Sequence, residues 1–187
     1  MTDSQHSILS GFGRRRRLRA QICAERERLY RIAWSWCHDS SQAEDLAQET
    51  MARGLAKFDS LRDESRLQVW LTQILANLFR DQCRRIQPEQ VQEHDLPASE
   101  DDPEQSTDRK QLIDHTRSAI ATLKNDQRQV LTLIDVAGFS YTDTAAILDV
   151  PVGTVMSRLS RARGRMREVL QQRGIGRADV VPMRKSQ

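Results

Sequence analysis

Residues 140–166 read SYTDTAAILDVPVGTVMSRLSRARGRM, and this stretch decides the fold. Ser140, followed three residues later by Asp143, has the pattern of a capping box, so a short helix is expected over 141–148. A turn of about four residues then leads to a long helix that opens at Gly153-Thr154. A short helix, a tight turn and a long basic helix together predict a helix-turn-helix motif.

The helices in and before this motif carry apolar stripes that predict a small helical core. In the long helix the apolar residues recur at i, i+4, i+7, i+11 and i+14, which is one helix face. A helix expected over 126–136 precedes the motif, and Gly138 is expected to end it in a left-handed conformation. The residues expected to be buried are Val130, Leu131, Leu133, Ile134, Ala145, Ala146, Leu148, Val155, Leu159, Ala162, Met166 and Val169.

The long helix and the residues after it are strongly basic. Residues 152–187 hold nine basic and two acidic side chains, a balance of +7, which is the electrostatic pattern of a nucleic-acid-binding segment. Arginine can pair with guanine edges or phosphates, and a helix N-terminus favours a phosphate. We therefore expect this helix to bind duplex DNA through the polar residues that project away from its apolar stripe, Thr154, Ser157, Arg158 and Arg161.

The first 86 residues also show helical periodicity, and no strand pattern stands out. One apolar stripe consists of Leu29, Ile32, Ala33 and Trp36. After a break at 39–41, a second helix is expected over 42–58. Its expected interior consists of Ala43, Leu46, Ala47 and Leu55, and its acidic outer face of Glu44, Asp45, Gln48 and Glu49.

A third helix is expected to start near Arg66. Its apolar stripe consists of Trp70, Leu71, Ile74, Leu75, Leu78 and Phe79. We expect Trp70 to belong to the core rather than to a surface on which bases stack. The opposite face carries a row of amides and arginines that suits phosphates and base edges: Gln73, Asn77, Arg80 and Arg84.

An acidic segment separates two basic parts of the chain. Residues 87–110 contain eight acidic and two basic side chains, whereas residues 1–86 and 111–187 have balances of +4 and +5. This segment also contains three prolines and almost no apolar periodicity, so it cannot bury enough surface to offset chain entropy. The sequence therefore predicts an all-α protein: two small helical domains joined by an acidic flexible linker.

The composition gives little support to other classes of protein. The three cysteines have no paired spacing, so neither a disulfide framework nor a complete cysteine-based zinc site is expected. No apolar run approaches the ~20 residues of a membrane span, and the arginine run at 14–17 is not followed by the apolar stretch of a signal peptide. No spacing of the histidines, phosphate loop or nucleophile elbow suggests an enzyme. We expect no catalytic residue, metal or cofactor, and a solvated basic arm over 1–24.

Two groups of segments resemble a known family. LYRIA (29–33), QAEDLAQET (42–50) and VWLTQILAN (69–77) resemble the second conserved region of the extracytoplasmic-function (ECF) sigma factors, the small two-domain members of the sigma-70 family. A second group of segments resembles the fourth conserved region of this family: QRQVL (127–131), FSY (139–141), AAIL (145–148) and VPVGTVMSRLSRAR (150–163). The resemblance implies region 2 over 25–86 and region 4 over 111–173, with the basic arm over 1–24, the linker over 87–110 and a basic tail over 174–187.

The resemblance also implies an alternative sigma factor for a stress or signal response, with one surface for core RNA polymerase and two for promoter DNA. In the family the second helix docks on the largest polymerase subunit, and the matching residues here are Asp45, Gln48 and Glu49. The third helix and the loop before it capture the melted −10 element, and the matching residues are Asp63, Ser65, Asn77, Arg80 and Arg84. The final helix enters the major groove of the −35 element, and the matching residues are Thr154, Ser157, Arg158, Ser160 and Arg161.

Two residues of the final helix depart from the family pattern. Met156 stands where relatives commonly carry Lys or Arg, and Ser160 stands where relatives often carry a bulkier residue. The family further implies an anti-sigma factor as a partner and a cytoplasmic protein, held near the inner membrane where that partner is membrane-bound. The residues leave open one alternative, a stand-alone helix-turn-helix regulator that binds duplex DNA without polymerase.

Overall fold

The computed structural model describes residues 3–61, 63–86 and 115–173, and it describes their side chains from residue 13 onward, except for Ile86. Within these ranges every regular element is a helix, which confirms the all-α prediction. The chain divides into two compact units whose boundary lies near residue 82. The linker predicted over 87–110 and the tail predicted over 174–187 fall outside the described residues.

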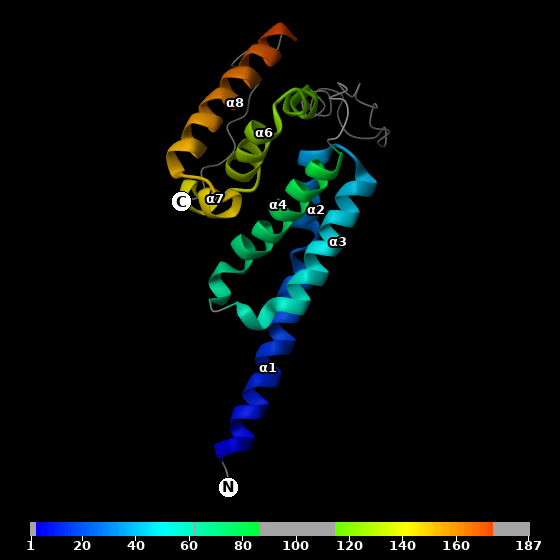
Figure 1. Cartoon of the computed structure of the whole chain (residues 1–187), viewed down its shortest axis with the longest axis vertical. Coiled ribbons are helices and arrows are strands. Elements are labelled where there is room, and N and C mark those ends of the chain that lie inside the picture. Colours follow the sequence, from blue (N-terminus) through cyan, green and yellow to red (C-terminus); the bar gives the residue numbers. More distant parts are fainter. Residues whose placement is uncertain (1–2, 62, 87–114, 174–187) are drawn as a thin grey trace, which may run out of the picture. The chain divides into compact units, whose positions relative to one another are not determined.

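The N-terminal unit contains the helices α1 (Asp3–Ala24), α2 (Arg26–Cys37), α3 (Ser40–Lys57) and α4 (Leu67–Ile86) (Figure 1). Two 3-10 turns, η1 (Phe58–Ser60) and η2 (Glu64–Arg66), connect α3 to α4. Helices α2 and α3 pack against each other, and the rings of Trp36 in α2 and Phe79 in α4 have centroids 5.4 Å apart. The buried apolar side chains are Leu18, Ile22, Leu29, Ile32, Ala33, Trp36, Ala43, Leu46, Ala47, Leu61, Leu67, Leu71, Leu75, Ala76 and Phe79.

Helix α1 differs from the predicted solvated arm. Leu18 and Ile22, one helical turn apart, are 1% and 0% exposed. The Cγ2 atom of Ile22 lies 3.7 Å from the place that a Cβ would take on Gly54 of α3. The sequence did not indicate that Leu18 and Ile22 are buried, because they lie among arginines and an apolar stripe of two residues is too short to identify a buried helix face. The C-terminal part of α1 therefore belongs to the core of the N-terminal unit.

Helix α3 begins at Ser40, two residues before the expected start at 42. Asp39 explains the difference, because its carboxylate accepts a hydrogen bond from the backbone N–H of Gln42 at 2.8 Å and so caps the helix. The predicted interior residues Ala43, Leu46 and Ala47 are buried, but Leu55 is only half-buried.

Two small or polar residues of α3, Thr50 and Gly54, are buried where the apolar pattern did not mark them. The Thr50 hydroxyl donates to the Leu46 carbonyl oxygen at 2.7 Å, which satisfies it inside its own helix. A Cβ on Gly54 would lie 2.7 Å from Cδ2 of Leu71, so the glycine lets α3 and α4 approach closely. In α4, Leu71, Leu75 and Phe79 are buried, whereas the predicted core positions Ile74 and Leu78 are half-buried.

The C-terminal unit contains a helix over 115–121, α6 (Asn125–Leu131), the π-helical turn η3 (Thr132–Val136), α7 (Tyr141–Leu148) and α8 (Val152–Gln172). Helices α7 and α8 and the turn between them form the predicted helix-turn-helix motif, and α8 packs against α6 (Figure 1). The buried apolar side chains are Ala119, Ile120, Leu123, Val130, Leu131, Leu133, Phe139, Ala145, Ile147, Leu148, Val155, Leu159, Ala162 and Val169.

The caps around the motif are the predicted ones. Gly138 has a φ of 77°, which is the left-handed conformation expected of it. The Ser140 hydroxyl accepts a hydrogen bond from the backbone N–H of Asp143 at 3.0 Å and caps α7. Pro151 precedes the first residue of α8, which starts at Val152, one residue earlier than expected.

The burial of two segments differs from the prediction. Residues 132–136 form a π-helical turn rather than regular α-helix, and Thr132 is buried there whereas Ile134 is only half-buried. In α7, Ile147 is fully buried and Ala146 is exposed, because eight residues give too few turns for the apolar spacing to identify the buried face. Met166 of α8, predicted as core, is half-buried.

Candidate protein and nucleic-acid interfaces

The first candidate surface is the α3 face, defined here as Asp45, Gln48 and Glu49, and all three side chains are exposed. Gln48 donates from Nε2 to Oε1 of Glu44 at 2.8 Å, which fixes the direction of its amide. Glu49 pairs with Arg53 at 2.7 Å, one turn further along the helix. The α3 face therefore offers the Asp45 carboxylate directly, whereas the Glu49 carboxylate would be shared between Arg53 and a cation of a partner.

Arg26 and Arg53 beside the α3 face were not identified from the sequence. The guanidinium of Arg26 in α2 lies 2.5 Å from Oε1 of Glu44 in α3. The hydrogen bond from Gln48, followed by the one from Arg26, lowers the pKa of Glu44. Glu44 is thus a neighbour that orients Gln48 and carries a charge already paired inside the protein.

The second candidate surface is the α4 loop site, which consists of residues 58–61 and 63–66 and of the polar row of α4, Gln73, Asn77, Arg80 and Arg84. Two of its predicted members bind each other: Asp63 accepts hydrogen bonds from the backbone N–H of Ser65 at 2.9 Å and from its hydroxyl at 2.7 Å. These bonds lower the pKa of Asp63, so its carboxylate is ionised at neutral pH and caps η2. In this structure Asp63 and Ser65 shape the loop.

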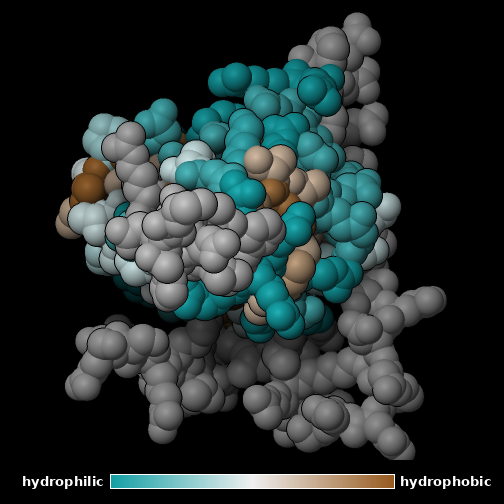
Figure 2. Space-filling model, turned by 90° about the horizontal axis from the view of Figure 1, so that it is seen from below, coloured by the Kyte–Doolittle hydropathy of each residue, from teal (hydrophilic) through white to brown (hydrophobic). Residues whose placement is uncertain are grey.

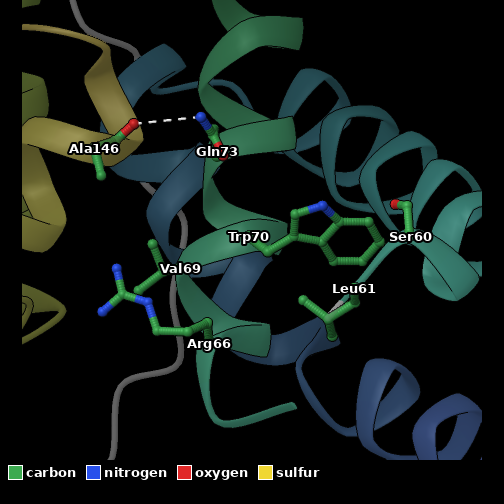
Figure 3. Close-up of a pocket in the computed structure, with 7 residues that line it drawn as sticks. All are labelled: Ser60, Leu61, Arg66, Val69, Trp70, Gln73 and Ala146. Carbon is green, nitrogen blue, oxygen red and sulfur yellow. Dashed lines mark hydrogen bonds between the residues drawn. The ribbon is translucent and has the colours of Figure 1, made fainter. Parts of the chain in front are cut away.

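Residues of the loop and of α4 surround a hollow (Figure 3). Trp70 is half-buried, and its indole ring points toward Ser60 and Leu61. Its Cζ3 atom also lies 3.8 Å from the Cβ position of Gly54, so the ring packs partly against α3. Because Trp70 also lines the hollow, the prediction that it belongs to the core alone is wrong. The side chains of the loop and of α4 that line it are Ser60, Leu61, Arg66, Val69, Trp70 and Gln73. The sequence assigned neither Val69 nor Trp70 to the binding site.

The polar row of α4 extends from this hollow along the helix, with Gln73 and Arg80 half-buried. Asn77 is exposed and its Oδ1 accepts a hydrogen bond from Nη1 of Arg80 at 3.1 Å, so these two predicted residues are neighbours. Arg84 is exposed one turn later. At 1.5 Å per residue, Arg84 lies roughly 25 Å along the axis of α4 from Leu67, the first residue of the helix. The predicted −10 residues therefore form two groups, Asp63 and Ser65 in the loop before α4 and Asn77, Arg80 and Arg84 along the helix.

The third candidate surface is the N-terminal half of α8. Ser157, Ser160 and Arg161 are exposed, whereas Thr154 is half-buried and its carbonyl oxygen accepts from the Ser157 hydroxyl at 3.0 Å. Met156, at 57% exposure, is open to a partner. These side chains give the surface hydroxyls, a thioether and an arginine, which suits base edges and thymine methyl groups.

Two arginines of α8 are paired inside the C-terminal unit. Arg158 lies 3.3 Å from a carboxylate oxygen of Asp126, at the start of α6. Arg163 binds Asp135 with two hydrogen bonds of 2.6 and 3.0 Å, which raise its pKa and hold α8 against η3. The sequence did not identify either acidic partner, because they lie about 30 residues away along the chain, at separations of 32 and 28 residues. Arg161, without such an ion pair among the described residues, is the predicted arginine most accessible to DNA.

Most of the side chains assigned to the three candidate surfaces are polar. Figure 2 shows one face of the molecule, on which hydrophilic residues predominate and hydrophobic ones form small patches. Within the described ranges, no three His, Cys, Asp or Glu side chains gather as metal ligands would. Of the helices described, none combines the length and the apolar character that crossing a membrane requires.

Comparison with known proteins places both units in one family. The chain matches the Sigma-70 region 2 model over residues 23–88 and the Sigma-70, region 4 model over 116–166. It is 38% identical over 154 residues to the ECF RNA polymerase sigma factor EcfG of Rhodopseudomonas palustris, which covers 82% of this chain and 84% of that protein. It is 32% identical over 146 residues to the RNA polymerase sigma-H factor of Pseudomonas aeruginosa, with 72% and 76% covered.

A solved structure agrees with these matches. The sigma factor RpoE, crystallised with the anti-sigma factor NepR from Bartonella quintana, shares 33% sequence identity and superimposes with a TM-score of 0.64 over 81% of this chain and 95% of that one. Since the two regional models occur in the family's order and EcfG is 38% identical over 84% of its length, the chain belongs to the ECF sigma factors of the sigma-70 family.

Proposed function

We propose that this protein is an alternative sigma factor that works in the bacterial cytoplasm without enzymatic activity of its own. It binds core RNA polymerase and directs initiation at promoters that carry a −10 and a −35 element. One observation supports the proposal most strongly. The chain, a member of this family, has a polar α4 loop site in one unit and a basic helix-turn-helix in the other.

The α3 face is the proposed docking surface for core polymerase. Its carboxylates and its oriented amide suit a partner surface that offers arginine or lysine. Glu44, already paired with Arg26, keeps the Gln48 amide in place for that partner.

The α4 loop site is the proposed reader of the −10 element as a single strand. An unstacked base needs a concave surface with an aromatic or apolar wall and polar groups at the rim. Trp70 and Leu61 supply such a wall, and Ser60, Arg66 and Gln73 supply polar groups around it. Asn77 and Arg80 continue the polar row toward Arg84, where the backbone of the strand would follow the helix.

The N-terminal half of α8 is the proposed reader of the −35 element in the major groove. Arg161 is exposed and can reach a guanine edge directly, with Ser157 and Ser160 beside it. Arg158 is half-buried and its Nε atom lies 3.3 Å from Asp126, so this ion pair restricts the direction in which its guanidinium can reach DNA. The N-terminus of α8 around Thr154 favours a phosphate.

An anti-sigma factor is the proposed regulatory partner. Support comes from the related RpoE, whose structure contains the anti-sigma factor NepR. We place such a partner in the cytoplasm or at the inner membrane, where it would hold this chain inactive until a signal releases it.

Charge reversal on the α3 face tests polymerase binding. Asp45→Arg combined with Glu49→Arg should weaken competition of the purified chain for core polymerase against another sigma factor, because both carboxylates are exposed and the fold does not depend on them. The control, Ala20→Arg with Ala24→Arg, adds two arginines at exposed positions of α1 with the same spacing. Equal competition by the two variants would show that the α3 face is not the docking surface.

A further inference from the structure

The arginine run of α1 lies against the loop of the α4 loop site. Arg14 donates from Nε to Oε1 of Glu64 at 2.7 Å and from Nη2 to the carbonyl oxygen of Leu61 at 3.2 Å. Nε of Arg17 lies 4.0 Å from the other carboxylate oxygen of Glu64. The guanidinium of Arg14 therefore links Leu61, which follows η1, to Glu64, the first residue of η2.

Arg15 binds the other end of the same loop. Its Nη2 atom lies 2.9 Å from Oδ2 of Asp59 in η1. Its guanidinium carbon also lies 5.7 Å from the centroid of the Phe58 ring, within the range of a cation–π contact. Arg14 and Arg15 together thus contact the loop at residues 58, 59, 61 and 64.

The position of these arginines is set by the core. Leu18 and Ile22, one and two turns further along α1, are fully buried and fix the helix against the rest of the N-terminal unit. Arg16 and Arg19 of the same helix are exposed, and among the residues that the structure describes they make no ion pair with the loop. The helix therefore presents two kinds of arginine, one kind turned to the loop and one kind turned to solvent.

The loop contacts have two physical consequences. Exposed ion pairs contribute little to global stability, so these arginines are not needed to hold the unit together. They do restrict the path of the loop, because Arg14 bridges a backbone carbonyl and a side chain that lie on different turns. They also neutralise Asp59 and Glu64, whose charges would otherwise repel the phosphates of a nucleic-acid strand.

We propose that Arg14 and Arg15 are positioning residues of the −10 site. From α1 they hold the loop residues 58–61 and 64 in the arrangement that receives an unstacked base. This inference rests on the proposed function of the α4 loop site. It extends the α4 loop site to α1. Arg14 and Arg15 precede the Sigma-70 region 2 match, which begins at residue 23. The arginines act through the loop and need not touch DNA themselves.

The test compares two double variants that remove the same charge. Arg14→Ala with Arg15→Ala should reduce discrimination between −10 sequences in a promoter-variant library by about threefold or more, the size expected for coupled neighbours. Amide hydrogen exchange at residues 59–66 should become faster in the same variant. The control, Arg16→Ala with Arg19→Ala, should change neither measurement. Core binding and −35 preference should be unchanged in both variants.

A charge swap separates positioning from general stability. Arg14→Glu with Glu64→Arg keeps an ion pair of reversed direction, so it should recover much of the −10 discrimination that Arg14→Glu alone loses. Thermal unfolding of the N-terminal unit should differ little among these variants. No recovery in the swap, or equal effects of the two alanine double variants, would overturn the inference.

One further variant distinguishes this inference from the function on which it rests. Asn77→Ala probes the α4 loop site directly. If it alters −10 discrimination while Arg14→Ala with Arg15→Ala does not, the positioning role is wrong and the proposed −10 site stands. If neither variant alters it, the −10 site is wrongly assigned and the inference falls with it.

Discussion

Replacing Ile22 by alanine should destabilise the N-terminal unit, because α1 is part of its core. Ile22 is 0% exposed and lies beside Gly54 of α3. Truncation of a buried isoleucine to alanine costs ~2–5 kcal/mol through lost transfer energy and the cavity that remains. The higher helix propensity of alanine returns less than ~0.7 kcal/mol. We therefore expect a loss of about 2–4 kcal/mol in the free energy of unfolding of this unit.

The sequence provides a probe that reports this unit alone. All three tryptophans of the chain, Trp34, Trp36 and Trp70, lie in α2 and α4. Urea unfolding followed by tryptophan fluorescence therefore monitors the N-terminal unit, and the change in midpoint gives the loss of free energy. Gln21→Ala is the matched control, because Gln21 is the exposed neighbour of Ile22, and its effect should stay within ~0.5 kcal/mol. If both variants unfold like the unchanged protein, α1 is a solvated arm and the packing described here is wrong.

Three further predictions concern the loop, the recognition helix and the acidic segment. Hydrogen bonds from Ser65 lower the pKa of Asp63 in the folded state, so the ionised carboxylate stabilises the fold above its unfolded pKa of ~3.9, and this stabilisation is lost as the pH falls through the folded pKa. Asp63→Asn should remove that part of the acid dependence of unfolding, as measured by tryptophan fluorescence. An unchanged pH profile of unfolding in this variant would contradict the prediction. Arg161→Ala should cost ~1–3 kcal/mol at the preferred −35 sequence and relax the preference at one base pair, whereas a uniform loss over all sequences in a promoter library would assign Arg161 to a phosphate. Removing four acidic charges of the predicted linker should impair transcription with core polymerase more than it impairs folding; the variant combines Glu100→Gln, Asp101→Asn, Asp102→Asn and Glu104→Gln. Normal initiation by this variant at physiological salt would show that the acidic segment serves only as a soluble connection between the two domains.

Much of the fold could be predicted from local patterns. The stripe at Val155, Leu159 and Ala162 identified the buried face of α8, and Ser140 with Asp143 located the start of α7. Gly138 has the left-handed backbone that its place after an apolar run suggested. In each of these cases the residues that determine the structure lie within a few turns of one another.

The differences arise where distant residues decide the structure. Leu18 and Ile22 looked like part of a basic arm, and only their packing in the N-terminal unit reveals them as core. Gly54 is buried because α4 approaches α3 there, which no spacing within α3 indicates. The π-helical turn that buries Thr132 likewise has no sequence signal of the kind that periodicity detects.

The candidate surfaces show the same division. Residue type and helix face sufficed to predict that Asp45, Asn77 and Arg161 are exposed. The partners that orient or occupy other site residues were missed, because Glu64 meets Arg14 across 50 residues and Asp126 meets Arg158 across 32. Long side chains with opposite charges have many alternative partners in a sequence, and only the tertiary fold selects one.

Transcription by core RNA polymerase reconstituted with the purified chain tests the central claim most directly. The templates are genomic fragments, and the measured quantity is the position of each transcript start. We expect starts that appear only when the chain is added, each preceded by the same pair of sequence elements at a constant spacing. A chain that yields no such starts with core polymerase, yet protects specific duplex sites by itself, would be a stand-alone regulator and would contradict the account.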